Sequence, residues 1–506
     1  MEKEFDVEGI PNRANDGIST DGDTTAKEDV QEYKYNYLTE QWGLEDISRY
    51  NKGGFHPIHI EDVLDDRYEV VHKLGSGGFG IVWLCRDRHL EKWRAVKVMT
   101  ADHSSNSAEA KTFEFLKQNS SLEELDKNHI AVPLDSFWID GPNGRHLCFV
   151  LPVYGCTISR WRDRLDDVDP TTAKLSKKIC QQIVQGLAFL HGKALCHGDF
   201  RPSNILMKLD QDALGQLDRA QMLELVEEPE AYEVQTVSGV DPRPRGPEYC
   251  VLPLTSEWCE KLIVEEIAIT DFGESFLMSS ARQSTGIPTS YAAPEILFRQ
   301  PVGIEVDIWS LACTFYEIRT GRNLFGGSFW GSAFERIVYE LEVMLGPLPN
   351  LYKKVWDDEG CKGPDHIVKA IEDAGSIVKM AATCSLASLN CARTDITDDT
   401  GYDDVFEAKL GKKRIQYPPC IGEGADEPPV EYRYEDEEVR DLADLLRQML
   451  QYHPENRISA EVIKGHRWLK GKKRPATIHT GLWYVLDMFQ RYVKFSALCF
   501  AIENIR

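Results

Sequence analysis

The stretch LCHGDFRPSNILM, residues 195–207, holds the polar side chains from which the rest of the sequence can be interpreted. Asp199 stands two residues after His197, and Asn204 stands five residues after Asp199. A carboxylate can accept a proton from a hydroxyl group, and an amide oxygen can bind a hard cation. Arg201 adds a positive charge between them, whereas Gly198 adds no side chain at all. An apolar run follows directly.

The spacing H-x-D-x-x-x-x-N is typical of loops that transfer phosphoryl groups. In this role Asp199 would accept or orient the proton of a substrate hydroxyl, and Asn204 would hold Mg²⁺. A single His-x-Asp pair is more often structural. The interpretation therefore depends on what the rest of the chain supplies.

The whole chain is acidic and long enough to bury a large core. It has 506 residues, of which 42 % are hydrophobic, and a formal net charge of −24. A surface of this sign repels nucleic acid and anionic membranes and attracts basic partners. We therefore expect a basic protein partner and no direct binding of nucleic acid, and we expect a monomer.

Cysteine usage and the N-terminal sequence indicate a reducing compartment. The 13 cysteines are scattered and form no C-x-x-C pair, which argues against a disulfide scaffold or a zinc site. The first residues, MEKEFDVEGIPNR, lack the apolar segment of a signal peptide. The most apolar tract, residues 482–502, contains Asp487, Arg491 and Lys494, which are costly at membrane depth. This tract predicts a helix packed on the protein. The second interpretation is a helix that lies at a membrane interface, and a membrane span is not expected. We expect a cytoplasmic or nuclear protein.

Local patterns divide the chain into segments. Residues 1–45 are polar, acidic and turn-rich, which predicts a disordered tail. Alternating apolar residues between 67 and 99, and again over 146–153, predict a small antiparallel sheet. Helical periodicity dominates the remainder. Two long charged stretches, at about 208–264 and 356–439, predict surface insertions.

The predicted fold class is α+β, with a small β-rich N-lobe and a large, mainly helical C-lobe. The predicted organisation is a tail over 1–45, an extension over 46–67, an N-lobe over 68–154, a C-lobe over 155–469 and a helical tail over 470–506.

A glycine-rich stretch, KLGSGGFGIVWL, lies between two of the predicted strands. It fits the pattern G-x-G-x-x-G-x-V with Gly75, Gly77, Gly80 and Val82. Dinucleotide-binding loops share this pattern, but they open a helix, whereas β-type residues flank this stretch on both sides. Glycines lack a Cβ, so the backbone amides of such a hairpin can approach phosphates closely. An ordinary glycine-rich hairpin is the alternative interpretation.

The sequence RAVK places Lys97 on the following strand, where its ammonium group can bind phosphates if a carboxylate fixes it. Glu109 and Glu114, in the helical stretch AEAKTFEFLK, compete for this role. Positions four and seven after Glu109 are apolar, whereas the same offsets from Glu114 reach polar residues. Glu109 is therefore the better candidate, because it shares a face with the buried stripe.

The sequence IAITDFGESF places Asp271 directly after an apolar strand. One carboxylate and one amide oxygen suit Mg²⁺, which keeps phosphate oxygens and waters as its other ligands. Together with Asn204, Asp271 forms the predicted metal site. The ordered series Lys97, Asp199, Asn204 and Asp271 would very rarely arise by chance.

Three further motifs make the resemblance to a eukaryotic protein kinase specific, over roughly residues 68–469. YAAPE ends at Glu295, DIWSLAC begins at Asp307, and QYHPENRISAEVIKGHRWL contains Arg457, which the resemblance pairs with Glu295. Small-molecule phosphotransferases also favour H-G-D-x-x-x-x-N. The three later motifs do not belong to the pattern of those families, so a small-molecule phosphotransferase is a weak alternative.

Within protein kinases the chain most resembles the SR-protein kinase family. The similarity lies in ISRYNKGGFHPIHIEDVLDDRYEVVHKLG, in GPNGRHLCFVLPVYG, in MLGPLP and in the long spacer before D-F-G. The resemblance makes Leu151 the residue that limits the depth of the adenine pocket. It implies that the ATP site comprises Leu74, Gly75, Ser76, Gly77, Gly78, Phe79, Gly80, Val82, Ala95, Lys97, Glu109, Pro152 and Tyr154. The implied catalytic residues are Lys97, Asp199, Arg201 and Asn204.

Some residues depart from the family pattern. Pro152 stands where the family usually has Glu, and Ala292 stands where the group has Arg, which leaves the inherited substrate preference open. Arg201 replaces the usual Lys but keeps a charge that can neutralise a phosphoryl group. Gly198 replaces the Arg that helps to bind a phosphate on the activation loop in regulated kinases. We therefore predict constitutive activity.

The predicted function is ATP- and Mg²⁺-dependent phosphorylation of Ser/Thr hydroxyls, with Arg/Ser-rich proteins as substrates. Acidic stretches at 335–342 and 357–359 flank the region where the family docks such peptides. The alternative is a pseudokinase that acts as a scaffold. A degraded kinase should lack at least one of the four essential groups, and this sequence retains all four.

Overall fold

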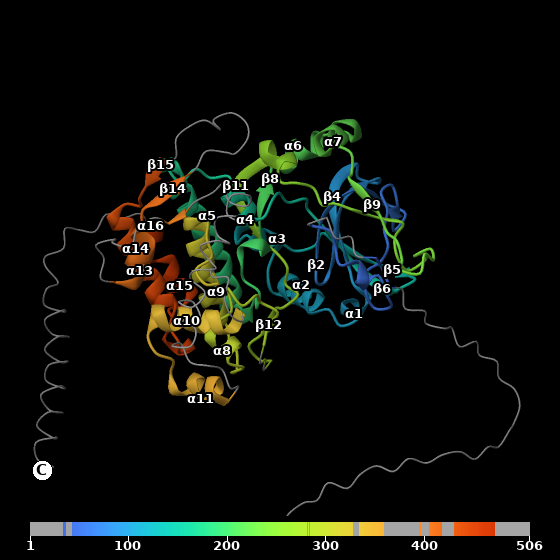
Figure 1. The fold of residues 1–506 in the computed structure, drawn as a ribbon. Helices are drawn as coiled ribbons and strands as arrows, with labels where there is room; N and C mark the ends of the chain where they lie inside the picture. The colour runs from blue at the N-terminus through green and yellow to red at the C-terminus, as the bar shows by residue number, and fades with distance from the viewer. Residues whose placement is uncertain are drawn as a thin grey trace, which may run out of the picture.

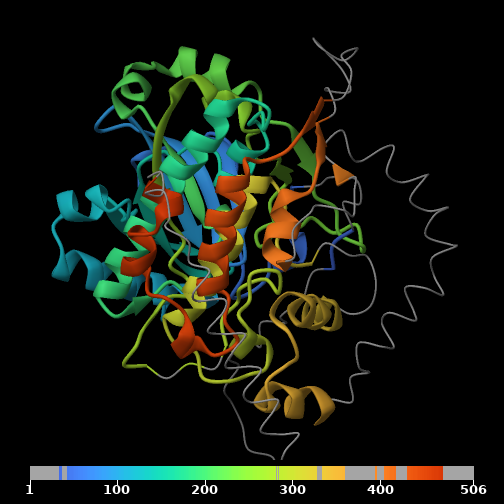
Figure 2. The same ribbon diagram turned by 90° about the vertical axis from the view of Figure 1, so that its left-hand side faces the viewer.

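The computed structural model describes residues 34–36, 43–280, 282, 284–326, 333–358, 394–395, 404–416 and 430–470. A sheet-rich lobe built by the first part of the chain adjoins a helical lobe built by the later part (Figure 1). A view turned by 90° shows the long helices of the second lobe packed beside one another (Figure 2). The predicted C-terminal helical tail, most of the second insertion and most of the acidic tail lie outside the described residues.

The N-lobe contains a six-stranded antiparallel sheet with the order β1-β2-β3-β4-β6-β5. Alternating apolar side chains give each central strand a buried face, which fixes its register. The strands are Val63–Leu64, Tyr68–Gly77, Gly80–Asp87, Lys92–Met99, Asp135–Gly141 and Gly144–Leu151, for β1 to β6 in chain order. The accompanying helices are η1 (Ile47–Arg49), α1 (Ala101–Ser104), α2 (Ala108–Asn119) and α3 (Leu122–Lys127).

Helix α2 packs its apolar face into the core between the lobes. Its N-cap is Ser107, whose side-chain oxygen accepts a hydrogen bond from the Ala110 amide at 3.0 Å. Phe113 and Leu116 are buried on the face that also carries Glu109. The cap and the apolar stripe together fix how the helix presents Glu109.

The C-lobe is built around two long helices, α5 (Pro170–Gly192) and α9 (Glu305–Thr320), of which α9 is buried almost throughout. Its other helices are α4 (Ile158–Arg162), η2 (Pro202–Asn204), α8 (Pro294–Leu297), α10 (Ala333–Leu345), α11 (Asn350–Asp358), α13 (Val405–Gly411), α14 (Asp436–Met449), η4 (Pro454–Asn456), α15 (Ala460–Lys464) and α16 (Arg467–Lys470). Its short strands are β7 (Leu195–Cys196), β8 (Ile205–Leu209), β11 (Ile263–Ile269), β12 (Phe276–Leu277), β13 (Thr394–Asp395), β14 (Arg414–Gln416) and β15 (Val430–Tyr432). The pairs β8–β11 and β7–β12 bring the catalytic loop and the D-F-G segment together.

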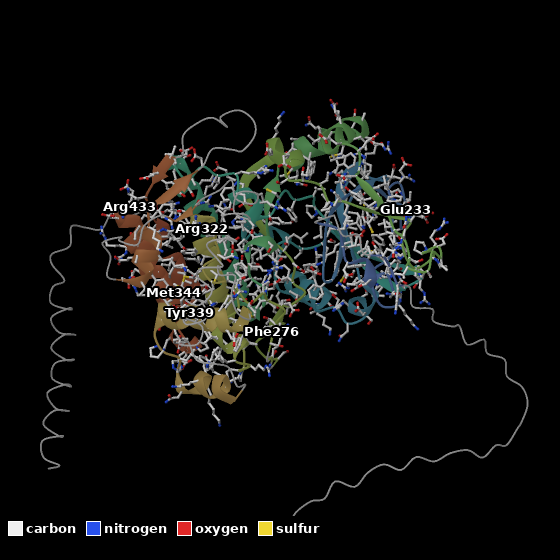
Figure 3. The ribbon with its side chains drawn as sticks, viewed as in Figure 1. Glu233, Phe276, Arg322, Tyr339, Met344 and Arg433 are labelled. Carbon is white, nitrogen blue, oxygen red and sulfur yellow. The ribbon has the colours of Figure 1, made fainter. Side chains whose placement is uncertain are left out.

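The first insertion forms secondary structure of its own and packs several apolar side chains against the N-lobe, which its charged sequence did not predict. It forms α6 (Gln211–Gln216), α7 (Arg219–Val226), β9 (Ala231–Glu233), β10 (Tyr249–Val251) and η3 (Glu257–Leu262). Met222 and Trp258 are buried in one cluster with Trp93 of β4, whose ring nitrogen donates to the Leu217 carbonyl oxygen at 2.9 Å. Figure 3 shows Glu233 of β9 on the N-lobe side, far from Arg433 in the C-lobe. These apolar contacts hold the insertion on the N-lobe sheet, although its sequence is rich in charged residues.

The residues just before the N-lobe also belong to the folded part of the chain, which corrects the predicted tail boundary at residue 45. The Glu45 carboxylate pairs with the Lys73 ammonium group inside the protein, and both side chains are almost fully buried. The Tyr50 hydroxyl donates to Glu45 at 2.6 Å. Tyr35 forms a β-bridge with Thr236 of the insertion and donates from its hydroxyl to the Tyr50 carbonyl.

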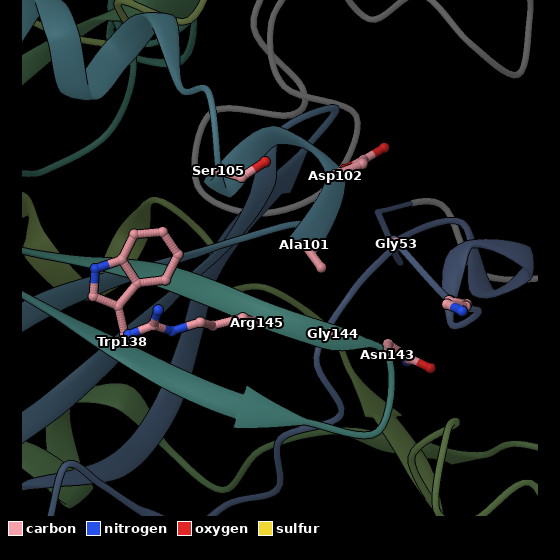
Figure 4. Close-up of a pocket in the computed structure, with 9 residues that line it drawn as sticks. Gly53, Ala101, Asp102, Ser105, Trp138, Asn143, Gly144 and Arg145 are labelled. Carbon is pink, nitrogen blue, oxygen red and sulfur yellow. The ribbon is translucent and has the colours of Figure 1, made fainter.

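A cavity of about 540 Å³ lies on the N-lobe between α1, the extension and the β5–β6 hairpin (Figure 4). Trp138 and Arg145 line one side, and the Arg145 guanidinium lies 4.7 Å from the centre of the Trp138 ring. None of the predicted site residues lines this cavity. Among the helices of the described ranges, none is long and apolar enough to cross a membrane.

Candidate active site

A lysine and two carboxylates form the electrostatic centre between the lobes. The Lys97 ammonium group on β4 donates to both Glu109 carboxylate oxygens, at 2.7 and 2.9 Å, and to Asp271 at 3.1 Å. Burial opposes the charge of Lys97, but the charges of Asp271 and Glu109 raise its pKa above the usual value. Burial would also raise the pKa of Asp271, yet Lys97 lowers it. Lys97 and Asp271 are therefore held in their charged forms, so the Lys97 ammonium group suits an anionic ligand and the Asp271 carboxylate suits a cation.

Burial has the larger effect on Glu109, whose pKa is raised despite Lys97. Glu114, the competing candidate, is exposed and accepts a hydrogen bond from Gln118 at 3.0 Å. The structure thus brings Glu109 to Lys97 and leaves Glu114 on the outer surface of α2.

The glycine-rich stretch forms the hairpin between β2 and β3, in which Gly77 pairs with Gly80. A Cβ built at Gly75, Gly77 or Gly78 would meet no described heavy atom within 4 Å. The open side of this hairpin leaves room for a group that contacts the backbone closely, which is what a phosphate cradle requires.

The tip of this hairpin is held from two sides. The Arg49 guanidinium of the N-terminal extension donates to the Gly78 carbonyl oxygen at 2.7 Å. A Cβ built on Gly273 would lie 2.9 Å from the Phe79 ring, so this ring lies directly against the D-F-G segment. Arg49 was not among the predicted site residues. Arg49 stands three residues after Asp46 in the extension, where no local pattern could have identified it.

The catalytic loop gathers two polar side chains around Asp199. The Asn204 amide nitrogen donates to the Asp199 carboxylate at 2.7 Å and to its carbonyl oxygen at 2.8 Å. The Arg201 guanidinium donates to the same carboxylate at 3.0 and 3.2 Å. The carboxylate is therefore fixed in orientation, and both of its partners belong to the predicted catalytic set, although the sequence did not predict these hydrogen bonds.

Asp307 of α9 holds the backbone of this loop from beneath. Its carboxylate accepts from the amides of His197 at 2.8 Å and Gly198 at 2.9 Å, and it lies 3.0 Å from the His191 ring nitrogen. Burial would raise the pKa of Asp307, but these partners lower it. A charged Asp307 thus ties the loop to the most buried helix.

Gly198 adopts the left-handed backbone conformation, which favours glycine. Its φ is +78°, and a Cβ built there would lie 3.1 Å from the Glu274 carbonyl carbon and closer to the carbonyl oxygen. The Arg282 guanidinium donates to that same carbonyl at 2.5 Å and to the Glu274 carboxylate at 2.6 Å. The position of the usual loop arginine is thus closed by the backbone, and an arginine from the activation segment lies beside it.

Aromatic rings connect α2 with the catalytic loop. Phe113 lies 5.7 Å from Phe272, whose ring is 5.1 Å from that of His197. The His197 ring nitrogen lies 3.0 Å from the Thr270 carbonyl oxygen. This row of buried rings places Glu109, Asp271 and Asp199 in fixed positions relative to one another.

The hinge between the lobes follows Leu151, which pairs with Ala95 at the end of β6. The Gln211 side-chain amide donates to the Val153 carbonyl at 2.9 Å, so the insertion supports the hinge from outside. Pro152 and Tyr154, the residues predicted to contact adenine, flank Val153 in this hinge.

At the base of the C-lobe, Arg457 donates to both Glu295 carboxylate oxygens, at 2.6 and 2.7 Å. This confirms the predicted pair between the YAAPE motif and the closing segment. The pair is fully buried, so its role is to hold the activation segment in place.

The family model described as "Protein kinase domain" matches residues 68–219 and 260–469. The chain belongs to the protein kinase family. The unmatched residues 220–259 lie within the packed insertion.

Individual relatives of this kinase carry related names. It is 27 % identical over 444 residues to "Serine/threonine-protein kinase SRPK" of Physarum polycephalum, a match that covers 85 % of this chain and 92 % of the relative. It is 37 % identical over 167 residues to human "SRSF protein kinase 3", but this match covers 32 % of this chain and only 29 % of the human protein. A solved kinase-domain crystal structure is 18 % identical, with a TM-score of 0.49, and the match covers 82 % of this chain and 98 % of that one.

Proposed function

We propose that this kinase transfers the γ-phosphoryl group of ATP to serine or threonine hydroxyls of basic, Arg/Ser-rich proteins. The observation that carries the proposal is the convergence of two clusters. Lys97, Glu109 and Asp271 come from both lobes, and Asp199 with Asn204 comes from the catalytic loop.

Each side chain has a role that its environment supports. Asp199 is oriented by Asn204 and can receive the proton of the attacking hydroxyl. Lys97, fixed by Glu109, can hold phosphate oxygens. The Arg201 guanidinium donates to Asp199 and can turn from it toward a phosphoryl group.

The residues present fit ATP and Mg²⁺. The open backbone at Gly75, Gly77 and Gly78 suits phosphates, and the carboxylate of Asp271 with the amide oxygen of Asn204 suits a hard cation. Magnesium, when bound, neutralises charge on the phosphates. Pro152 and Tyr154 would hold adenine through their backbone groups.

The substrate class is inferred from charge and from the names of the relatives, which include "SRSF protein kinase 3". The net charge of −24 favours a basic partner. The acidic stretch 335–342 lies in α10, where two of its carboxylates also serve the fold. Glu340 accepts from the Gly326 amide at 2.7 Å and Glu342 from the Leu348 amide at 3.1 Å. The stretch 357–359 extends beyond the described residues.

The test is phosphate transfer from labelled ATP, with Mg²⁺, to an Arg/Ser peptide and to a Glu/Ser peptide of equal length. We expect the Arg/Ser peptide to be preferred and the preference to shrink as salt is added, since the Debye length falls to about 8 Å at physiological ionic strength. Preference for the acidic peptide would refute the substrate class. Absence of transfer to both peptides and to the kinase itself would refute the activity.

A pure scaffold is a poorer explanation of the geometry. A degraded kinase should lack at least one of the four essential groups, whereas here Lys97 donates to Asp271 and Asn204 donates to Asp199.

A further inference from the structure

Two thiols from distant parts of the chain meet just beyond the hinge. Cys156 follows the hinge directly, and Cys259 lies in η3 at the end of the first insertion. Each thiol lies close enough to the other to shift its pKa. A Cβ built on Gly155, the residue before Cys156, would lie 3.4 Å from the Cys259 sulfur, so the backbone geometry also places the two residues together.

Both backbones are fixed, so the proximity of the two residues is built into the fold. The Met207 amide of β8 donates to the Cys156 carbonyl at 2.9 Å, and the Gly155 amide donates to the Met207 carbonyl at 2.8 Å. The Asp210 amide donates to the Leu262 carbonyl at 2.8 Å, which ties η3 to the end of the same strand. The Cys259 sulfur also lies 3.5 Å from the Ser256 carbonyl oxygen.

The two thiols have different surroundings. Cys156 is partly exposed, whereas Cys259 is buried. The neighbouring Cys259 thiol and the charge of Arg164 lower the pKa of Cys156 against the effect of its burial, and the Cys156 thiol together with burial raises the pKa of Cys259. Arg164 is itself held by Glu260 at 2.5 Å. An accessible thiol with thiolate character beside a protected second thiol is the arrangement of a reactive cysteine and its resolving partner.

We propose that Cys156 and Cys259 form an oxidation site that responds to hydrogen peroxide. The Cys156 thiolate attacks one peroxide oxygen, so that an S–O bond forms, the O–O bond breaks and hydroxide leaves. The Cys259 sulfur then attacks the resulting sulfenic acid, so that an S–S bond forms and the S–O bond breaks. The second hydroxide and the thiol protons leave as water. Two thiols and one peroxide thus give one disulfide and two waters, and the sulfurs lose two electrons to the peroxide oxygens.

The other described cysteines are poor competitors for peroxide. Burial raises the pKa of each of their thiols, and all of them lie inside the core: Cys85, Cys148, Cys180, Cys196, Cys250 and Cys313. A buried neutral thiol reacts slowly because the thiolate is the nucleophile. Selectivity for Cys156 among these residues follows from its environment.

The experiment uses the reduced full chain, treated with hydrogen peroxide in the presence of dimedone, then alkylated and mapped by peptide mass spectrometry. We expect a Cys156–Cys259 disulfide in the wild type, reversed by dithiothreitol. Cys259→Ser should carry a dimedone adduct on Cys156 at least tenfold more abundant than on any of the six core cysteines. In Cys156→Ser, Cys259 should stay free for alkylation. Cys250→Ser, a matched buried control, should behave as the wild type.

Results on the wild type decide the matter even if a variant folds poorly. A dimedone adduct on Cys156 without a disulfide to Cys259 would overturn the pair, as would a disulfide from Cys156 to any other cysteine. A wild type that gives neither product would overturn the site. A dimedone adduct on Cys259 in Cys156→Ser, at the rate seen for Cys156, would overturn the order of attack.

Discussion

The Cβ position of Gly198 lies against the carbonyl group of Glu274, 3.1 Å from its carbon. The residue before the catalytic Asp199 therefore has no space for a side chain. Arg282 donates to the same Glu274 carbonyl and to its carboxylate. In a regulated kinase, the arginine before the catalytic aspartate binds a phosphate on the activation segment. In this kinase the contact between Arg282 and Glu274 takes that place.

Gly198→Ala should reduce both stability and transfer activity. The left-handed conformation costs a non-glycine residue about 1–2 kcal/mol, and the Glu274 carbonyl must also move. Two controls separate these causes: Gly239→Ala also has positive φ but faces open space, and Gly215→Ala has neither problem. Thermal unfolding and peptide phosphorylation should rank Gly198→Ala as the most affected. Equal loss in Gly198→Ala and Gly239→Ala would show that the Glu274 contact has no effect.

Activity should not depend on phosphorylation of the activation segment, because Arg282 already holds it. Replacement with Ala of Ser279, Ser280, Ser284, Thr285 and Ser290 should leave peptide phosphorylation within a few-fold of the wild type, and so should phosphatase treatment. Thr289 stays unchanged, since the family places a Thr that supports the catalytic loop near this position. A loss above tenfold in both experiments would contradict constitutive activity. Arg282→Ala, in contrast, should lower activity, with Arg282→Lys intermediate.

Asp199→Asn should abolish phosphorylation while folding and ATP binding persist. Loss of a general base or hydroxyl anchor lowers the rate by about 10²–10⁴-fold. Single-turnover transfer and nucleotide binding by calorimetry would separate chemistry from binding. Normal autophosphorylation by the purified variant would show that the Asp199 assignment is wrong.

Glu109→Gln should lower the turnover rate through Lys97. The amide cannot match the carboxylate that fixes the ammonium group at 2.7 Å, and misplacement of a reacting group by about 1 Å can lower the rate about 10²-fold. Glu114→Gln, on the exposed side of the same helix, is the matched control and should be unaffected. Similar rates for the two variants would exclude the proposed role of Glu109.

Mild acid should destabilise the N-lobe through a pair of histidines. The rings of His56 and His146 lie 4.9 Å apart, and burial together with the charge of His146 lowers the pKa of His56 from 6.5 to about 4. Between pH 6.5 and about pH 4, His56 therefore binds a proton in the unfolded chain but stays neutral in the folded protein. The contribution of His56 to the free energy of unfolding is therefore present in full at pH 7 and falls as the pH falls. At pH 5 the loss is at most about 2 kcal/mol.

The measurement is thermal unfolding at pH 7 and pH 5. His56→Gln should reduce the difference between the two pH values, whereas the exposed control His89→Gln should preserve it. An unchanged difference in His56→Gln would assign the acid sensitivity to other groups.

The sequence predicted the features that depend on residues close to one another along the chain. Alternating residues around Gly77 and Gly80 predicted the hairpin, and helical spacing placed Glu109 rather than Glu114 on the buried face. The packing of the first insertion was missed because its charges hid the apolar Leu214, Met222 and Val226, whose helical spacing was the available signal. Contacts such as Arg282 with Glu274 depend on backbone geometry that no residue pattern specifies.

The buried pair of Glu45 and Lys73 has a practical consequence for anyone who expresses the catalytic part alone. The family match begins at residue 68, and a recombinant fragment cut there would keep Lys73 inside the lobe without its carboxylate. Removal of one partner of a buried ion pair typically costs about 3–5 kcal/mol, enough to make such a fragment aggregate or fail to accumulate. A fragment that begins before Tyr35 would keep both this pair and the hold of Arg49 on the glycine-rich hairpin.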